Sequence, residues 1–234
     1  MERIDKVIAS SCGRSRKDAR IMVFKGLVTV NSSVCRDISF KVDTDTDKIL
    51  VDGKDITYKK YVYIMINKPK DVLSASNDKS RETVVDIVKA DFPREGLFPV
   101  GRLDKDTTGL LIITDDGDFG HKVISPKSCI EKEYLVTVDK PLKKEDIITL
   151  EKGVTLTDGT VCRPAKVKVF DDEHLISMTI TEGKYHEIKR MLGVVGVGVD
   201  GLTRIRIGKL SIDTKLSEGE YRELSADELA LVWK

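Results

Sequence analysis

The stretch Gly101-Arg102-Leu103-Asp104-Lys105-Asp106-Thr107-Thr108-Gly109-Leu110-Leu111 brings two glycines, two cations and two carboxylates to the entrance of an apolar run. The run continues to Ile113 and predicts a buried strand, because turn-forming residues bound it on both sides. Catalytic groups are often found on loops that a rigid strand holds in place. By themselves, however, an arginine and an aspartate two residues apart are explained better by an ion pair that shapes the loop.

The surrounding sequence predicts an α+β domain with mainly antiparallel strands. Strand and helix patterns alternate, and several strands follow one another as hairpins. Pro69 ends the first strand of this region, since proline has no amide hydrogen to donate. Ser225 and Glu228 form a capping box for a last helix that ends near Trp233. The expected strands are 61–66, 110–113, 134–138, 166–170 and 175–180, and the expected helices are 143–150 and 185–192.

The composition is typical of a soluble globular protein. The chain has 234 residues, of which 40% are hydrophobic and 34% charged, so a core can be buried beneath a charged surface. No apolar run approaches the length of a membrane span, and the N-terminal residues contain no apolar signal region. We therefore expect a cytoplasmic protein without a membrane partner. The cysteines are not spaced as metal ligands, which predicts reduced thiols and no metal site: Cys12, Cys35, Cys129 and Cys162.

The N-terminal segment is much more basic than the chain as a whole. Residues 1–36 hold eight basic and three acidic residues, whereas the whole chain has a net charge of +1. Ser15 and Gly26 are suitable as the N-cap and the stop of a helix. Arg16 and Arg20 lie four residues apart on that helix and share one of its faces. The pattern fits either an anionic partner such as nucleic acid or a solvated helix face.

Two motifs in this segment, Ser15-Arg16-Lys17-Asp18-Ala19 and Lys25-Gly26-Leu27-Val28-Thr29-Val30-Asn31, resemble the S4 RNA-binding domain. Ser32 stands where that family commonly has glycine, and a turn tolerates the change. The resemblance implies an S4 domain (αL-like) at residues 1–56, a linker at 57–60 and a catalytic domain at 61–234. It also implies that basic side chains of the small domain contact RNA: Arg3, Arg16, Lys17, Arg20 and Lys25.

The stretch around Asp104 resembles the catalytic motif of the pseudouridine synthases, and most closely that of the RsuA-type family that acts on ribosomal RNA. The resemblance implies an isomerase that moves the sugar of uridine from N1 to C5 of uracil, a reaction without a redox step, metal or cofactor. Further stretches follow in the family's order over most of residues 61–234: Asn67-Lys68-Pro69, Thr114-Asp115-Asp116-Gly117, Ser125-Pro126, Glu131-Lys132-Glu133-Tyr134-Leu135-Val136 and Glu182-Gly183-Lys184-Tyr185-His186-Glu187-Ile188-Lys189-Arg190-Met191.

The resemblance also implies roles for single residues. Asp104 would act as a nucleophile at C1′ or as the base of a glycal route, and aspartate is ordinarily ionised at neutral pH. Tyr134 would stack on the turned-out uracil and help to move a proton. Lys189 would hold Asp104 ionised and oriented, with Arg190 as its rival or as a phosphate contact. Arg102 would fill the space that the flipped base leaves.

Each of these roles has a plainer structural alternative. Tyr134 alone would be a tyrosine on a half-buried strand, and Arg102 alone would be one partner of an ion pair. Glu187 stands where the family commonly has glutamine. This departure affects the hydrogen bonds around Glu187 and leaves the Lys189 assignment intact.

Taken together, the motifs predict an enzyme that converts a specific uridine of ribosomal RNA to pseudouridine. The segments 106–109 and 114–117 resemble most the members that act on 16S (small-subunit) ribosomal RNA, which is the expected partner. Two alternatives stay open: a sister enzyme for 23S ribosomal RNA, and a non-catalytic S4-type RNA-binding or ribosome-assembly protein. The sequence shows no coiled-coil pattern, so we expect a monomer.

Overall fold

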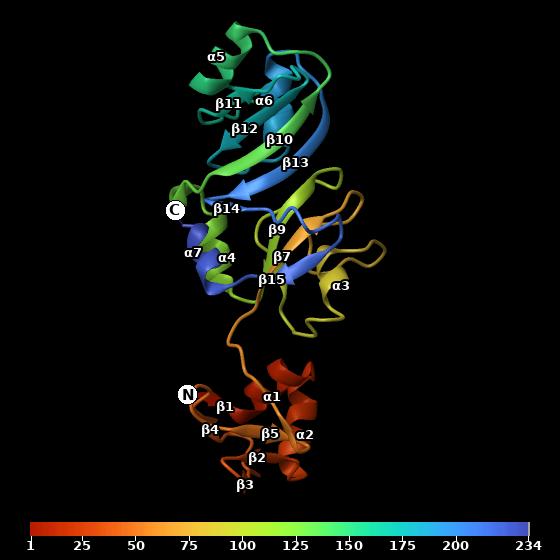
Figure 1. Cartoon of the computed structure of the whole chain (residues 1–234), viewed down its shortest axis with the longest axis vertical. Coiled ribbons are helices and arrows are strands. Elements are labelled where there is room, and N and C mark those ends of the chain that lie inside the picture. The colour runs from red at the N-terminus through yellow and green to blue at the C-terminus, as the bar shows by residue number, and fades with distance from the viewer. Residues whose placement is uncertain (234) are drawn as a thin grey trace. The chain divides into compact units, whose positions relative to one another are not determined.

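A computed structural model describes residues 1–233, and Figure 1 shows its helices and strands. The chain divides into two units. Met1–Val62 and Asp86–Leu97 form the first unit, whereas Tyr63–Val85 and the chain from Phe98 onward form the second. No helix formed by residues 1–233 has both the length and the apolar character that crossing a bilayer requires.

In the first unit, two helices pack beside small antiparallel sheets. Helix α1 buries Ile4, Val7 and Ile8 in the core of this unit, as their helical spacing predicts. Helix α2 is capped by Ser15, whose Oγ accepts a 3.1 Å hydrogen bond from the Asp18 amide. One sheet has the order β3-β2-β5-β6, and β1 pairs with β4. The elements are α1 (Ile4–Cys12), α2 (Arg16–Phe24), β1 (Glu2–Arg3), β2 (Val28–Val30), β3 (Ser33–Val34), β4 (Lys41–Val42), β5 (Ile49–Val51) and β6 (Lys54–Asp55).

The framework of the second unit is a sheet of nine strands. Its main path is β11-β12-β10-β13-β9-β7-β15, with β14 paired to β13 and β8 paired to β9. Strands β13 and β9 pair in parallel, and the other strand pairs of this sheet are antiparallel. The predicted α+β class is therefore confirmed. The strands are β7 (Tyr63–Lys68), β8 (Phe98–Pro99), β9 (Thr108–Thr114), β10 (Lys132–Val138), β11 (Lys166–Val169), β12 (Leu175–Ile180), β13 (Val199–Ile207), β14 (Leu210–Ser211) and β15 (Tyr221–Glu223).

Strand β9 lies at the centre of this unit, and all of its residues are buried. The apolar run that predicts a strand at 110–113 therefore forms one, extended at both ends. Helices α4 and α7 lie side by side near its end (Figure 1), and Phe119 of α4 meets the Tyr63 ring edge-on with a centroid distance of 5.0 Å. The helices of the chain from residue 84 onward are α3 (Val84–Val88), α4 (Gly117–Ile124), α5 (Lys144–Lys152), α6 (Glu187–Val194) and α7 (Ala226–Leu231), with a 3-10 turn at Pro126–Ser128.

The parallel pairing of β9 and β13 depends on Gly109. Its φ of +98° is accessible to glycine and strained for other residues. A Cβ at this position would lie 2.3 Å from the carbonyl oxygen of Arg204 on β13, which is far too close. The second glycine of the opening motif thus allows two backbones to approach each other directly behind the charged loop.

The structure corrects one helix start. The sequence predicts a helix at 185–192, but α6 begins at Glu187. His186 has a φ of +47°, outside the helical region, so Tyr185 and His186 precede the helix instead of forming its first turn. The capping box of Ser225 and Glu228 is confirmed at the start of α7.

Candidate active site and nucleic-acid interface

The loop that carries Asp104 is fixed through its backbone. Leu103 is buried, and its amide donates a 3.1 Å hydrogen bond to Oγ of Ser74. The Ser74 hydroxyl in turn donates a 2.9 Å hydrogen bond to the Leu103 carbonyl oxygen. Because both backbone groups of Leu103 are bonded to one side chain, the next residue, Asp104, is presented in a defined position.

A buried lysine holds the other half of the same loop. Lys68, at the end of β7, is completely buried, and its Nζ donates hydrogen bonds to three carbonyl oxygens. The acceptors are Pro69 at 2.8 Å, Lys105 at 3.3 Å and Thr107 at 3.0 Å. Burial lowers the pKa of Lys68 to about 8, because the charged form loses its hydration. The sequence places Lys68 at a strand end and gives no sign of this function.

Asp104 and Tyr134 line one pocket of the second unit, together with Arg102, His186 and Leu202. Tyr134 comes from β10 and is 8% exposed, and the Asp104 side chain is 27% exposed. The pocket therefore offers a partly exposed carboxylate beside an aromatic ring. This combination can accept a planar base whose sugar reaches the carboxylate.

Lys189 and Arg190 are adjacent in α6 but have different partners. Lys189 Nζ lies 3.6 Å from Oδ2 of Asp104 and bonds both oxygens of Asp106, at 2.6 and 2.7 Å. Arg190 donates a hydrogen bond of 2.5 Å to Asp158. Of the two candidates for the cation beside Asp104, Lys189 is therefore the one that lies near it. Lys189 is at the same time bonded to the Asp106 carboxylate. The hydrogen bond from Lys189 also lowers the pKa of Asp106.

Arg102 is exposed and lines the same pocket. Among residues 1–233, no partner forms an ion pair or a hydrogen bond with its guanidinium. The alternative in which Arg102 shapes the loop through an ion pair thus has no partner among these residues. Its cation is free to contact a ligand.

His186 is a member of the site for which the sequence alone proposes at most a supporting role. Its Nε2 lies 3.5 Å from Oδ1 of Asp104, on the opposite carboxylate oxygen from Lys189. The unusual backbone of His186 at the start of α6 produces this placement, and no sequence pattern encodes it.

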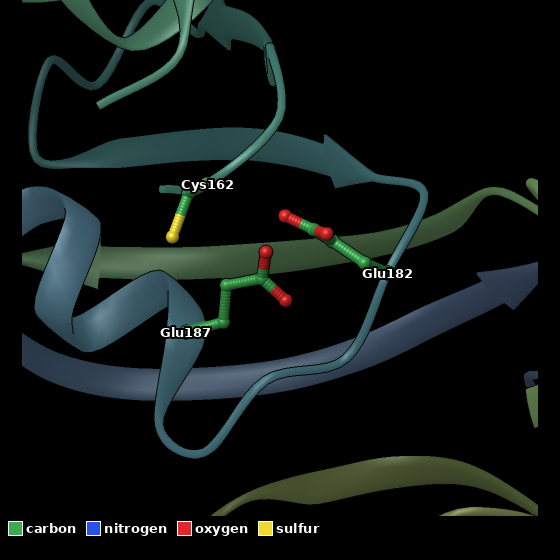
Figure 2. A group of neighbouring side chains, drawn as sticks. All are labelled: Cys162, Glu182 and Glu187. Carbon is green, nitrogen blue, oxygen red and sulfur yellow. The ribbon is translucent and has the colours of Figure 1, made fainter. Parts of the chain in front are cut away.

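Three buried residues with metal-binding side chains lie close to this pocket: Cys162, Glu182 and Glu187 (Figure 2). Glu182 already accepts an ion pair from Lys184 and a 2.8 Å hydrogen bond from the Arg163 amide. Burial works to raise the pKa of Glu182, but the Lys184 and Arg163 contacts outweigh it and lower that pKa. A carboxylate with these partners is poorly suited to bind a cation.

Glu187 is instead suited to carry a proton. Burial raises its pKa to about 7, and the neighbouring Glu182 contributes to the increase. Oε1 of Glu187 is buried without a hydrogen-bond partner among residues 1–233. A proton on this oxygen gives it a donor for Glu182, so the geometry favours a shared proton over a bound metal.

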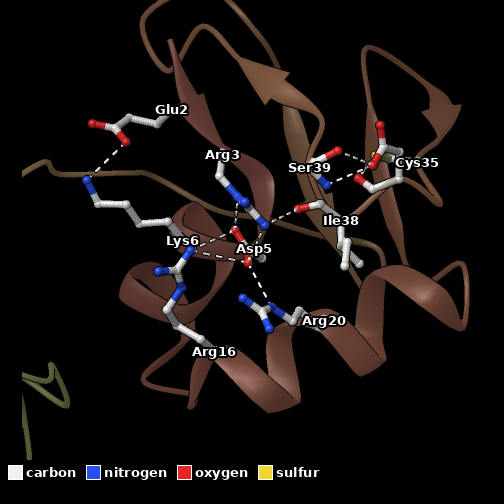
Figure 3. Close-up of polar contacts among 10 residues, drawn as sticks. Glu2, Arg3, Asp5, Lys6, Arg16, Arg20, Cys35, Ile38 and Ser39 are labelled. Atoms are coloured by element: carbon white, nitrogen blue, oxygen red, sulfur yellow. Dashed lines mark hydrogen bonds and ion pairs between the residues drawn. The ribbon is translucent and has the colours of Figure 1, made fainter.

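In the first unit, three predicted RNA contacts converge on one carboxylate (Figure 3). The carboxylate of Asp5 is fully buried and accepts hydrogen bonds from Arg3 at 3.1 Å, Arg16 at 3.2 Å and Arg20 at 3.0 Å. Burial works to raise the pKa of Asp5, but the three arginines outweigh it and lower that pKa. The arginine side chains stay 42–48% exposed, so Asp5 holds three cations together at the surface.

The other two predicted contacts of this unit are exposed. Lys17 lies on α2 between Arg16 and Arg20, and Lys25 follows the end of the same helix. The three arginines around Asp5 form a basic surface, which is the kind of surface that binds a phosphate backbone, and Lys17 and Lys25 add exposed cations to the same unit.

Residues 62–193, more than half of the chain, match the family model described as RNA pseudouridylate synthase. The chain belongs to this family. Residues 2–49 match the S4 domain, which lies within the first unit of this pseudouridine synthase. The sequence-based family assignment is therefore confirmed, and the second unit contains most of the residues that match the synthase model.

Similar proteins support the same family over the whole chain. An uncharacterized RNA pseudouridine synthase of Bacillus subtilis, YtzG, is 41% identical over 98% of both chains. The ribosomal small subunit pseudouridine synthase A of Pasteurella multocida is 38% identical over 97% of this chain and 98% of its own. A putative ribosomal large subunit pseudouridine synthase of Arabidopsis thaliana chloroplasts, SVR1, is 34% identical over 100% of this chain and 61% of its own.

A solved structure described as a pseudouridylate synthase has the same fold. It aligns with a TM-score of 0.69 and 33% identity, over 99% of this pseudouridine synthase and 100% of that chain.

Proposed function

We propose that this pseudouridine synthase isomerises one uridine of small-subunit ribosomal RNA and that Asp104 acts on the sugar. The observation that carries the proposal is the pocket in which the Asp104 carboxylate lies beside the Tyr134 ring, with Arg102 at its edge. The similarity to the small-subunit enzyme of Pasteurella multocida, which extends over nearly the whole chain, supports the choice of RNA.

The reaction conserves all atoms of uridine. The bond between N1 and C1′ breaks, the uracil turns within the pocket, and a bond between C5 and C1′ forms. C5 then loses its proton, and N1 gains one. Asp104 either attacks C1′ or removes a proton from the sugar in a glycal route, and both routes need an ionised carboxylate.

The residues around Asp104 serve this chemistry in different ways. Lys189, whose Nζ lies 3.6 Å from Oδ2 of Asp104, orients the carboxylate. Tyr134 presents its ring to the turning uracil. Arg102 has no partner among residues 1–233, and it takes the place of the flipped uridine in the RNA, which offsets the cost of about a few kcal/mol for unstacking.

The S4 domain supplies the affinity for RNA. Residues 1–56 act as the S4 domain, residues 57–60 as a linker and residues 61–234 as the catalytic domain. The basic surface around Asp5 contacts phosphates, which makes binding sensitive to salt. Removing residues 1–55 should therefore weaken RNA binding and flatten its salt dependence, and an unchanged slope would contradict this role.

One of the comparisons supports large-subunit ribosomal RNA as an alternative substrate. The similarity to a putative large-subunit synthase means that the 23S RNA is a rival substrate for the same pocket. A non-catalytic RNA-binding role is less well supported, because a binding protein has no use for a partly exposed carboxylate directed at an anionic ligand.

Mapping of pseudouridine in ribosomal RNA tests the proposal. The protein and its Asp104→Asn variant are incubated with unmodified 16S RNA or a small-subunit assembly intermediate, and pseudouridine is mapped by chemical labelling and primer extension. We expect one new stop that is absent with the variant. A stop only on 23S RNA would move the substrate to the large subunit, and full activity of Asp104→Asn would exclude Asp104 as the acting carboxylate.

A further inference from the structure

Two consecutive aromatic side chains are stacked at the edge of the pocket. The rings of Tyr185 and His186 have a centroid distance of 3.8 Å and an interplanar angle of 19°. Neighbouring residues of a strand point to opposite faces, and those of a helix diverge around its axis. The parallel stack is possible here because His186 adopts the left-handed conformation, with φ at +47°.

The chain accepts a strained backbone at this position. A histidine with positive φ is uncommon, and such strain is typically found at functional sites. The conformation contributes no side-chain cap to α6, since His186 makes no capping hydrogen bond. What it does produce is the ring stack, together with the contact between His186 and Asp104 at 3.5 Å.

The outer ring of the stack is open to solvent. Tyr185 is 73% exposed, although a tyrosine ring is largely apolar. His186 covers one face of the ring. Tyr185 also lines a groove beside the pocket, in which four basic side chains outnumber the two carboxylates of Asp78 and Asp104: Arg81, Arg102, Lys105 and Lys184. A flat aromatic face among cations is the combination that binds single-stranded nucleic acid, in which bases stack and phosphates pair with charges.

We propose that Tyr185 is a stacking platform for the nucleobase of a nucleotide that flanks the target uridine. This inference rests on the proposed function, since it needs RNA in the pocket. His186 contacts both Asp104 and Tyr185, so Tyr185 lies close to the reacting nucleotide, and we assign it a flanking base of the same strand. The hydroxyl is not needed, because stacking uses the face of the ring.

Equilibrium binding tests the platform without requiring turnover. Affinity is measured by fluorescence anisotropy with a short fluorescein-labelled oligouridylate. We expect Tyr185→Ala to bind roughly 5- to 150-fold more weakly, the range for the loss of one stacked base, with an unchanged salt slope because no charge is lost. Tyr185→Phe should bind as the wild type does.

The matched control is Ile148→Ala, another exposed apolar side chain of the second unit, which lies on α5 and should not affect binding. Circular dichroism shows whether each variant is folded. Equal affinities of Tyr185→Ala and wild type would overturn the proposal, as would a Tyr185→Phe variant that binds as poorly as Tyr185→Ala. A protein-binding role for Tyr185 would appear as the first of these results.

Turnover separates this inference from the function on which it rests. The mapped uridine is flanked by an abasic nucleotide, placed in turn at each neighbouring position of the RNA. At the position whose base stacks on Tyr185, the abasic nucleotide should weaken RNA binding to the wild type. It should not weaken binding to Tyr185→Ala any further. If the abasic nucleotide and Tyr185→Ala weaken binding additively at every flanking position, the stack is excluded, whereas the formation of pseudouridine is not. Absence of pseudouridine on every RNA would reject the function, and oligouridylate binding would still decide whether Tyr185 stacks.

Discussion

Lys189 donates hydrogen bonds to both carboxylate oxygens of Asp106, at 2.6 and 2.7 Å, while it stands 3.6 Å from Asp104. Lys189 therefore lies close to two carboxylates. Its hydrogen bonds go to Asp106, for which the family resemblance implies no role. The Asp106 side chain is 69% exposed, so its bond to Lys189 can be given up when RNA enters the pocket.

We expect Lys189→Met to lower the single-turnover rate constant about 10- to 100-fold, because the Asp104 carboxylate loses the cation that holds it in position. Lys189→Arg should recover part of the rate. Arg190→Met is the control, since Arg190 bonds Asp158 and should affect RNA affinity more than the rate. If Lys189→Met has a normal single-turnover rate constant and Arg190→Met a low one, Arg190 is the cation that supports Asp104.

Replacing Lys68 should loosen the loop that carries Asp104, and Lys68 itself is completely buried. Lys68→Met keeps a similar volume but removes the donor that joins the carbonyl oxygens of Lys105 and Thr107, and Lys105 keeps only its bond from the Asp71 amide. We expect slower turnover and faster tryptic cleavage after Arg102 or Lys105. Lys79→Met, at an exposed position, should change neither. Unchanged proteolysis in Lys68→Met would show that the loop is held by other contacts.

The direction in which Asp5→Asn changes RNA affinity tests whether Asp5 positions the arginines of the basic surface. Asp5→Asn removes a negative charge, so electrostatics alone predicts tighter RNA binding. If Asp5 holds Arg3, Arg16 and Arg20 in place, the variant binds more weakly, and the slope of log affinity against log salt falls by about 1–2.

The measurement for this prediction is a salt titration of RNA binding, with circular dichroism to verify folding. Asp45→Asn is the matched control, because it removes the same charge from an exposed turn of the same unit and should leave binding unchanged or slightly tighter. If a folded Asp5→Asn variant binds RNA more tightly, the Asp5 carboxylate does not position the arginines, and its negative charge only weakens RNA binding.

Glu187 should make the protein less stable as the pH rises. Its pKa in the folded state is raised to about 7, so between about pH 4.5 and pH 7 the folded chain binds more protons at this position than the unfolded chain. Stability is then lost as the pH rises through this window, by roughly 3 kcal/mol at most. Glu187→Gln, which keeps a hydrogen-bond donor at every pH, should remove this loss.

Urea unfolding at pH 5 and pH 8 measures the effect as a difference between wild type and variant. Glu151→Gln, at an exposed position of α5, controls for the change of charge. Parallel pH profiles for wild type and Glu187→Gln would show that Glu187 is ionised throughout the range, and that no proton is shared with Glu182.

The sequence predicts best what is local. The Ser15 cap, the Ser225 capping box and the strand at 110–113 each depend on residues close together in the chain, and all three are confirmed. Helix starts are less predictable. The backbone of His186 departs from the helix, and the pattern that includes Tyr185 contains no signal for this.

The network of the site was beyond prediction because its members are distant in sequence. Asp5 meets Arg20 from another helix, and Lys68 meets Thr107 across 39 residues. Burial gives Glu187 its unusual pKa, and burial follows from the packing of the whole unit. Family resemblance supplied Asp104, Tyr134 and Lys189, whereas the supporting contacts required the structure.

The parallel pairing of β9 and β13 also determines when the pocket can form. Thr108 and Thr203 are joined by a 2.8 Å hydrogen bond between their side chains, 95 residues apart in sequence. Contacts of such long range are slow to form, because the intervening chain must be ordered first. During synthesis, Asp104 emerges well before β13 and α6, which carry the other wall of its pocket. A nascent chain therefore displays the Asp104 carboxylate without the rest of the pocket, and the proposed site is complete only near the end of folding.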